Sequence, residues 1–303
     1  MAGHYYLDRF SILNRCVVVE GWATDFDPLL TYAGEPLPMS VQRVDRPDLI
    51  ASHGEEARHL GFALCAALPT NELDKGLFAF RFNAEVTLER IWERFAAPED
   101  VRFIEMTAEF QDAVARRPGR FLEIGSRARS GNSYRHWFSS EIDYVGMDVA
   151  PGPNVDIVGD AHALSTITNE TFDYIFSIAV FEHLLMPWKV ALEMNKVMKT
   201  GGLALIMSHN AWPLHEEPWD FWRYSRESWQ GLFNAHTGFK VKRAEYQYPA
   251  SIVPQYTHTD DTVHMSRGKV YLASGCLVEK IGRPMVSWHG KTADVYNLGY
   301  SHA

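Results

Sequence analysis

From residue 120 onward the chain alternates short apolar runs with helical segments, and this alternation restricts the fold more than any other feature. The apolar runs that we predict to be strands cover residues 121–124, 144–148, 155–158, 174–178, 203–208, 239–247 and 269–280. Strands that alternate with helices form a parallel sheet with right-handed crossovers. The sequence therefore predicts an α/β fold with a seven-stranded, doubly wound, mostly parallel sheet.

The N-terminal part of the chain has a different pattern. Within residues 1–83, β-rich runs such as 16–23 and 77–82 are separated by turn-rich stretches, which predicts a small β-sandwich-like domain. Apolar residues at helical spacing predict a helical connector or cap over residues 84–117. Residues 118–282 hold the predicted sheet, and the patternless residues 283–303 form a C-terminal tail or a lid.

Composition excludes several classes of protein. The chain is 46% hydrophobic and 22% charged, with a net charge of −9 and no long Lys/Arg run, so we expect a soluble globular protein that binds no nucleic acid. No apolar run approaches the ~18 residues of a membrane span. Cys16, Cys65 and Cys276 are far apart and odd in number, so we expect no disulfide framework and a cytoplasmic location. A homo-oligomer is compatible with these features.

Polar residues follow the predicted strands in a regular way. The strand at 121–124 runs into a small-residue loop, where Gly125 would let the backbone approach a ligand closely. Glu123 on this strand suits a cationic cofactor. Asp148 ends the next strand, where an acid accepts hydrogen bonds from ribose hydroxyls, and Asp160 ends a third strand, placed to meet an adenine amino group. We expect these three carboxylates to converge at one edge of the sheet.

In this order and at these separations, the segments resemble the class I, Rossmann-like S-adenosylmethionine (SAM)-dependent methyltransferases over roughly residues 120–277. The resemblance implies SAM as the cofactor. The residues that it assigns to cofactor binding are Glu123, Gly125, Ser126, Asp148, Asp160, Ala161 and Ser177. The phrases at 181–184 and 199–203 are typical of the small-molecule and glycan branches, and residues 1–83 resemble small β-domains of bacterial surface-glycan enzymes. The chain departs from the family at Arg127, where glycine is common.

A dense loop after the fifth predicted strand is the candidate acceptor site. Its tryptophans offer flat apolar faces with polar edges, which complement a sugar. The candidate substrate-binding residues are His209, Trp212, Glu216, Trp219, Asp220, Trp222 and Arg223. A hydroxyl acceptor benefits from a neutral histidine as base, and His183 and His215 are the candidate catalytic residues. The alternative is that the aromatic residues cover a sheet edge, with Asp220 and Arg223 as a structural pair.

We therefore predict a SAM-dependent methyltransferase (EC 2.1.1 class) that methylates a hydroxyl of a sugar or another small acceptor in surface-glycan biosynthesis. A non-catalytic accessory or binding protein on the same fold is the alternative. An oxidoreductase is a third option, but the tight Gly-x-Gly-x-x-Gly fingerprint is missing. Residues 257–264 contain possible oxygen and nitrogen ligands for a metal, which a solvated polar loop explains equally, and we assign no metal.

Overall fold

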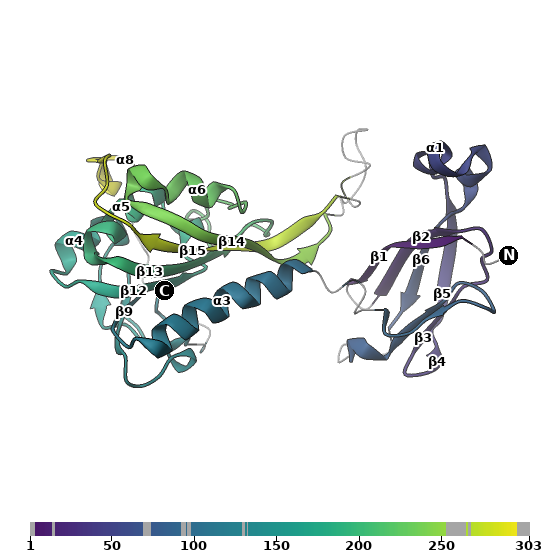
Figure 1. Cartoon of the computed structure of the whole chain (residues 1–303), viewed down its shortest axis with the longest axis horizontal. Helices are drawn as coiled ribbons and strands as arrows, with labels where there is room; N and C mark the ends of the chain where they lie inside the picture. Colours follow the sequence, from purple (N-terminus) through teal and green to yellow (C-terminus); the bar gives the residue numbers. More distant parts are fainter. Residues whose placement is uncertain are drawn as a thin grey trace. The chain divides into compact units, whose positions relative to one another are not determined.

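The structure is a computed structural model that describes residues 4–13, 16–68, 74–91, 95, 98–128, 131, 133–252, 265 and 268–295. The chain forms two compact units, Met1–Ala96 and Ala97–Ala303 (Figure 1). The second unit carries the strand ends on which the function prediction depends.

The first unit contains two four-stranded antiparallel sheets, with strand orders β1-β2-β6-β5 and β4-β3-β7-β8. Its elements are β1 (Tyr5–Leu13), β2 (Cys16–Ala23), β3 (Leu29–Tyr32), β4 (Glu35–Pro36), β5 (Met39–Val44), α1 (Ile50–His53), β6 (Gly61–Ala67), β7 (Phe78–Arg81) and β8 (Thr87–Leu88). Alternate residues of the facing strands are buried in one core, for example Val17 and Val19 of β2 and Phe78 and Phe80 of β7. The sheets share this core in the manner of a β-sandwich.

One expectation about this unit is wrong. Cys16 and Cys65 form a disulfide between the paired strands β2 and β6, with their Cα atoms 6.4 Å apart. The two cysteines are 49 residues apart in sequence, so only the pairing of the strands brings them together. Cys276 is free and buried. Because disulfides are rare in reducing compartments, cysteine usage no longer supports a cytoplasmic location.

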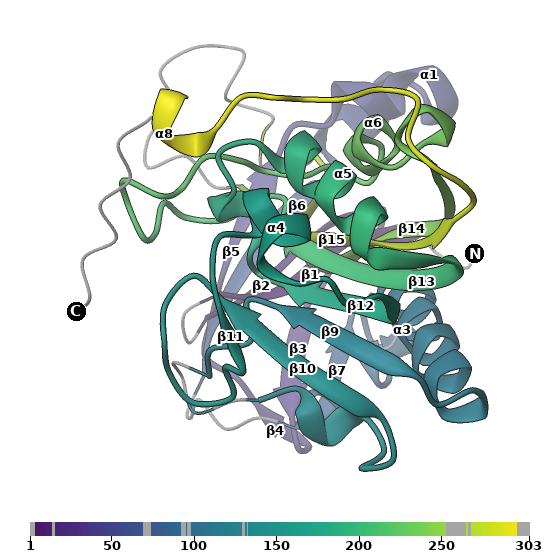
Figure 2. The same ribbon diagram turned by 90° about the vertical axis from the view of Figure 1, so that its left-hand side faces the viewer.

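The second unit is built on a seven-stranded sheet with the order β11-β10-β9-β12-β13-β15-β14 (Figure 2). Its strands are β9 (Arg120–Ile124), β10 (Asp143–Asp148), β11 (Ile157–Val158), β12 (Phe172–Ile178), β13 (Met198–His209), β14 (Phe239–Ala250) and β15 (Val270–Lys280). β15 is antiparallel to both of its neighbours, and all the other neighbouring strands are parallel. The predicted seven-stranded, mostly parallel sheet is confirmed.

Helices cover both faces of this sheet (Figure 1). Successive side chains of a strand point to opposite faces, and the apolar ones contribute to two cores, one on each face. The helices of the unit are α3 (Pro98–Arg116), α4 (Leu164–Ile167), α5 (Pro187–Val197), α6 (Ser228–Leu232) and α8 (Thr292–Val295). Phe121 of β9 packs with Phe110 of α3 on one face, whereas Leu122 shares the opposite core with Val190 of α5. The predicted helical segment 84–117 is partly wrong, because Thr87–Leu88 pair with β7 instead.

The path of the chain creates a crevice in the middle of the sheet. From β9 the chain moves outward to β10 and β11, and it then returns to the other side of β9 as β12. The carboxyl ends of β9 and β12 therefore lie at a topological switch point, where α/β sheets of this type bind ligands. Among the described residues, no helix has the length and apolar character needed to cross a membrane.

The buried hydrogen bonds of Ser274 link β15 to the segment 224–229, and their contribution to stability can be tested. Its hydroxyl is buried on β15, where it donates to the carbonyl of Tyr224 (2.6 Å) and accepts from the indole nitrogen of Trp229 (2.9 Å). We predict that Ser274→Ala lowers the free energy of unfolding by about 1–3 kcal/mol, because both partners lose a buried hydrogen bond. Urea unfolding measures the change. The control Ser140→Ala, at an exposed position, should stay within about 0.5 kcal/mol, and an equal effect of the two changes would contradict the account.

Candidate functional site

A cavity of about 510 Å³ lies at the carboxyl ends of β9, β10, β11 and β12. Its lining combines the residues that follow these strands with parts of two later segments. The lining residues are Ile124, Gly125, Arg127, Met147, Asp148, Val149, Gly159, Asp160, Ala161, His162, Ala179, Val180, His183, Leu184, Glu216, Trp219, Thr292 and Ala293. The volume falls within the range of small-molecule and cofactor sites.

A glycine is required where the chain leaves β9. Gly125 has a φ of +83°, and a Cβ atom at this position would overlap Cγ2 of Val180. Ser126 and Ser177, which the sequence places among the cofactor residues, do not line the cavity. The hydroxyl of Ser126 donates to the carbonyl of Asn154 (2.8 Å), and that of Ser177 donates to the carbonyl of Ile124 (3.1 Å). Both side chains are buried, and their hydrogen bonds are to backbone carbonyls.

Asp148 ends β10 and lines the cavity, as the sequence predicts. Its Oδ1 accepts a hydrogen bond from the amide of Ala150 (3.0 Å) and lies 3.6 Å from Nε of Arg127. Arg127 occupies the position where the resemblance expects glycine, and its side chain lines the cavity too. The cavity therefore contains a carboxylate with a cation beside it.

Asp160 lines the cavity and caps a short 3-10 turn (Ala161–Ala163). Its Oδ1 accepts hydrogen bonds from the amide and the ring of His162 (2.9 and 2.6 Å), and its Oδ2 accepts one from the hydroxyl of Thr292 (2.8 Å). Burial opposes ionisation of Asp160, but the bonds from His162 outweigh it and lower the pKa of Asp160 to about 2. The carboxylate is therefore charged at neutral pH and fixed in position.

The predicted convergence of three carboxylates is correct for two of them only. Glu123 is buried on the face of β9 opposite to Leu122 and does not line the cavity. Its carboxyl group accepts hydrogen bonds from the hydroxyl of Tyr144 and from Nδ2 of Asn154 (3.1 Å). Burial raises the pKa of Glu123. Side chains alternate along a strand, so the acid one residue before the end of β9 faces away from the side that Ile124 lines.

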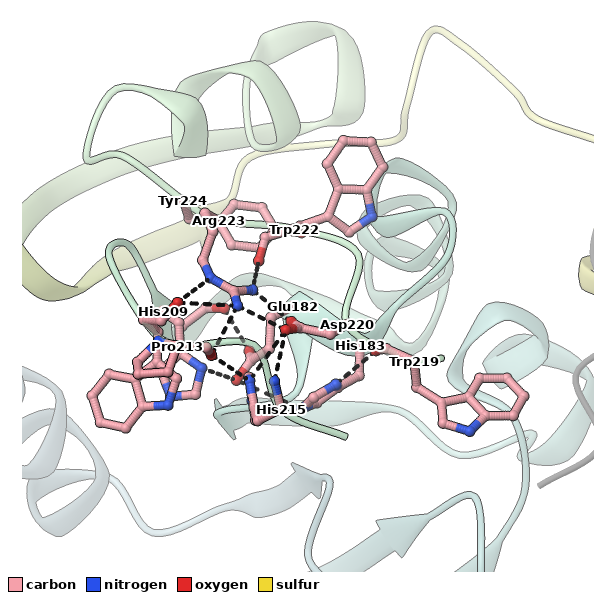
Figure 3. Close-up of polar contacts among 12 residues, drawn as sticks. Glu182, His183, His209, Pro213, His215, Trp219, Asp220, Trp222, Arg223 and Tyr224 are labelled. Atoms are coloured by element: carbon pink, nitrogen blue, oxygen red, sulfur yellow. Dashed lines mark hydrogen bonds and ion pairs between the residues drawn. The ribbon is translucent and has the colours of Figure 1, made fainter. Parts of the chain in front are cut away.

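Glu182 is the centre of a polar cluster next to the cavity (Figure 3). Its side chain is fully buried, its Oε2 accepts from the hydroxyl of Ser208 (2.5 Å), and its Oε1 lies 2.9 Å from Nδ1 of His209. Its carbonyl accepts from the amides of Phe221 and Trp222, which anchors the loop that follows β13. Burial opposes ionisation, but His209 and Ser208 outweigh it and hold the pKa of Glu182 below its ordinary value.

The two predicted catalytic histidines lie side by side, with ring centroids 4.9 Å apart. Nδ1 of His183 donates to the carbonyl of Trp219 (2.7 Å), which leaves Nε2 as the nitrogen without a proton in the neutral ring. His183 lines the cavity, whereas His215 lies behind it and does not.

The predicted acceptor residues divide into two groups. Glu216 and Trp219 line the cavity, but His209, Trp212, Asp220, Trp222 and Arg223 do not. Arg223 binds both oxygens of Asp220 (2.5 and 2.7 Å) and holds the pKa of Asp220 well below its usual range. The indole nitrogen of Trp222 donates to the carbonyl of Leu184 (2.8 Å). Figure 3 shows Trp219 and Trp222 pointing away from the polar cluster. These contacts of Asp220, Arg223 and Trp222 fit the alternative interpretation of the loop, in which its aromatic residues cover a sheet edge and Asp220 and Arg223 form a structural pair.

The sequence did not indicate several residues of the cavity and of the polar cluster next to it. The ring of His162 donates to Asp160 through Nδ1 and accepts from the amide of Met186 through Nε2 (3.1 Å). The only feature of the sequence that could have indicated His162 is its position two residues after Asp160. Thr292 lies in the predicted tail, which reaches the cavity although its sequence shows no pattern. Glu182 lies within residues 181–184, which are typical of the small-molecule and glycan branches, but the resemblance assigns no role to it. The possible metal ligands at 257–264 lie outside the described residues.

Residues 98–245, just under half of the chain, match the model of a family described as "Methyltransferase domain". No curated protein matches the chain.

Similar solved structures include the YcgJ protein of Bacillus subtilis, which is 16% identical, with 59% of this chain and 97% of that one covered and a TM-score of 0.40. A SAM-dependent methyltransferase of Archaeoglobus fulgidus is 15% identical (63% and 98% covered, TM-score 0.42). The 1,6-didemethyltoxoflavin-N1-methyltransferase of Burkholderia thailandensis, solved with 1,6-didemethyltoxoflavin and S-adenosylhomocysteine, is 12% identical (57% and 76% covered, TM-score 0.41).

Proposed function

We propose that the chain is a SAM-dependent methyltransferase that acts on a small hydroxylated acceptor. The observation that carries the proposal is that Asp148, at the end of β10, and Asp160, two residues after the neighbouring strand β11, line one cavity beside the glycine turn at Gly125. The match of residues 98–245 to a methyltransferase-domain family supports it.

The residues of the cavity fit the parts of this cofactor. Asp148 offers carboxylate oxygens to the ribose hydroxyls, and Asp160 and the amide of Ala161 offer an acceptor and a donor to the adenine edge. At Gly125 the absence of a side chain leaves the backbone open to the ligand. When bound, SAM supplies a methyl group that its sulfonium already activates, so the protein's task is to orient the acceptor and exclude water.

His183 is the base in this proposal. Its Nδ1 proton is held by the carbonyl of Trp219, so Nε2 is available to accept the proton of an acceptor hydroxyl. Trp219 and Glu216 line the same cavity and supply an apolar face and a polar edge. A sugar presents both kinds of surface, and we propose a sugar of surface-glycan biosynthesis as the acceptor, as the sequence predicts.

One observation favours a second candidate, a binding protein on the same fold that transfers no methyl group. Arg127 places a guanidinium 3.6 Å from Oδ1 of Asp148, where it competes for the acid assigned to the ribose. Labelled-methyl transfer from SAM separates the candidates, because a binding protein transfers nothing.

We expect S-adenosylhomocysteine to bind the chain and Asp148→Ala to weaken that binding roughly 10- to 150-fold. The reason is that a hydrogen bond to a charged group contributes about 1.5–3 kcal/mol, and each 1.4 kcal/mol is about tenfold in affinity. Isothermal titration calorimetry measures the change. Asp143→Ala, at the exposed start of the same strand, is the matched control and should bind normally. Unaltered affinity in Asp148→Ala, or a rise in melting temperature with NADH but not with S-adenosylhomocysteine, would count against the assignment.

Loss of the base should slow the reaction without weakening cofactor binding. We predict that His183→Ala lowers kcat about 10²- to 10⁴-fold, the usual contribution of general base catalysis, while S-adenosylhomocysteine binds as before. Transfer of labelled methyl from SAM to a panel of nucleotide sugars is the assay, and His136→Ala at an exposed position is the control. A kcat that is equal in His183→Ala and the wild type would remove His183 from the mechanism.

A further inference from the structure

The side chains around Glu182 form a second candidate site beside the cavity, which the methyltransferase proposal does not use. Oε1 of Glu182, Nδ1 of His209 and Nε2 of His215 are all buried, and none of them has a hydrogen-bond partner among the described residues. The ligand atoms that these three residues offer lie within 4.8 Å of one another. Three buried polar atoms without hydrogen bonds at one place need a further partner, because such atoms are costly to leave unsatisfied.

We propose that Glu182, His209 and His215 bind one divalent transition-metal ion, of which Zn²⁺ is the best match. Two imidazole nitrogens and one carboxylate are a ligand set for Zn²⁺, Fe²⁺ and related ions and a poor one for Mg²⁺ or Ca²⁺. Oε1 of Glu182 and Nδ1 of His209 are 2.9 Å apart but are not aligned for a hydrogen bond. Two atoms bonded to one ion at about 2.1 Å lie about 3.4 Å apart at the tetrahedral angle that Zn²⁺ prefers, so this separation has to widen by about 0.5 Å when the ion binds.

Neighbouring groups hold each ligand in the form that a metal requires. Nδ1 of His215 lies 3.2 Å from the carbonyl of Pro213 and 3.4 Å from Oδ2 of Asp220, and both of these oxygens are acceptors. Nδ1 therefore carries the proton, and Nε2 has a free electron pair. A carboxylate behind a histidine ligand is a common second partner in metal sites. The other oxygen of Glu182 is fixed by Ser208.

The cluster lies near the surface and beside the cavity. The side chains of His209 and His215 are 14% and 26% exposed, so the cluster lies close to the surface although Glu182 is fully buried. Nε2 of His183 lies 3.9 Å from Oε1 of Glu182, so the cluster adjoins the cavity through His183. In a role that rests on the proposed function, an open coordination position on this side would orient the oxygen of an acceptor. Metal binding itself does not depend on that role.

The first experiment measures metal binding by the full chain without SAM. After treatment with a chelator, the wild type is titrated with Zn²⁺ alone by calorimetry, and bound metal is counted by plasma mass spectrometry. We expect one ion per chain and a higher melting temperature on loading. A wild type that retains none of Zn²⁺, Fe²⁺, Mn²⁺, Co²⁺ or Ni²⁺ would overturn the proposal.

Variants then test the assigned ligands. His209→Ala and His215→Ala should each weaken Zn²⁺ binding by more than about 100-fold, because outer partners of metal ligands alone contribute 10- to 100-fold. His236→Ala, at an exposed histidine of the same unit, is the matched control and should bind as the wild type does. Circular dichroism verifies that each variant is folded, and Glu182→Gln replaces either one that is not. Binding that survives all the ligand substitutions would overturn the assignment.

His183→Ala separates this site from a second grouping of His183, His215 and Asp220, whose ligand atoms are also close together. Asp220 is already bound by Arg223, so we expect His183→Ala to retain the ion. Loss of Zn²⁺ in His183→Ala together with full retention in His209→Ala would contradict the proposed ligands. Binding of S-adenosylhomocysteine is measured on the same samples, so failure of the metal site and failure of the proposed function give different results.

Discussion

Parallel strands end at a common edge, and the site depends on this constraint. The chain leaves β9 through Gly125, whose positive φ and lack of a Cβ atom permit a turn tight against Val180. The turn brings the loop after β9 beside the end of β10, and the third strand delivers Asp160 to the same cavity. Fixed backbone geometry, rather than flexible side chains, therefore positions the two carboxylates that face the cavity.

A buried carboxylate organises the other half of the site. Glu182 has no exposure to water, and its ionised form is maintained by Ser208 and His209. Through its carbonyl it also anchors the amides of Phe221 and Trp222, so one residue positions both the polar cluster and the loop that carries the tryptophans. Glu182 does not line the cavity itself, but its Oε1 lies 3.9 Å from Nε2 of His183, which does, so the cavity and the proposed metal site meet at His183.

The sequence predicted the seven strands and the two cavity carboxylates, because both follow from local patterns: apolar runs for strands and an acid at a strand end. It failed where the answer depends on tertiary contacts. The face of the sheet to which the Glu123 side chain points depends on the residue at which β9 ends. The resemblance to a family does not determine that residue. The Cys16–Cys65 disulfide requires the pairing of β2 and β6, and Thr292 reaches the cavity from a segment without periodicity. The three buried atoms without hydrogen bonds, one each in Glu182, His209 and His215, come together only when three separate segments of the chain are folded.

A crystal structure of the chain with S-adenosylhomocysteine tests the central claim most directly. The account predicts density for the ligand in the cavity, with the ribose hydroxyls at hydrogen-bond distance from Asp148 and the adenine beside Asp160 and Ala161. Ligand density at another place would contradict it. So would a cavity without ligand at saturating concentration, in which Arg127 still lies beside Asp148.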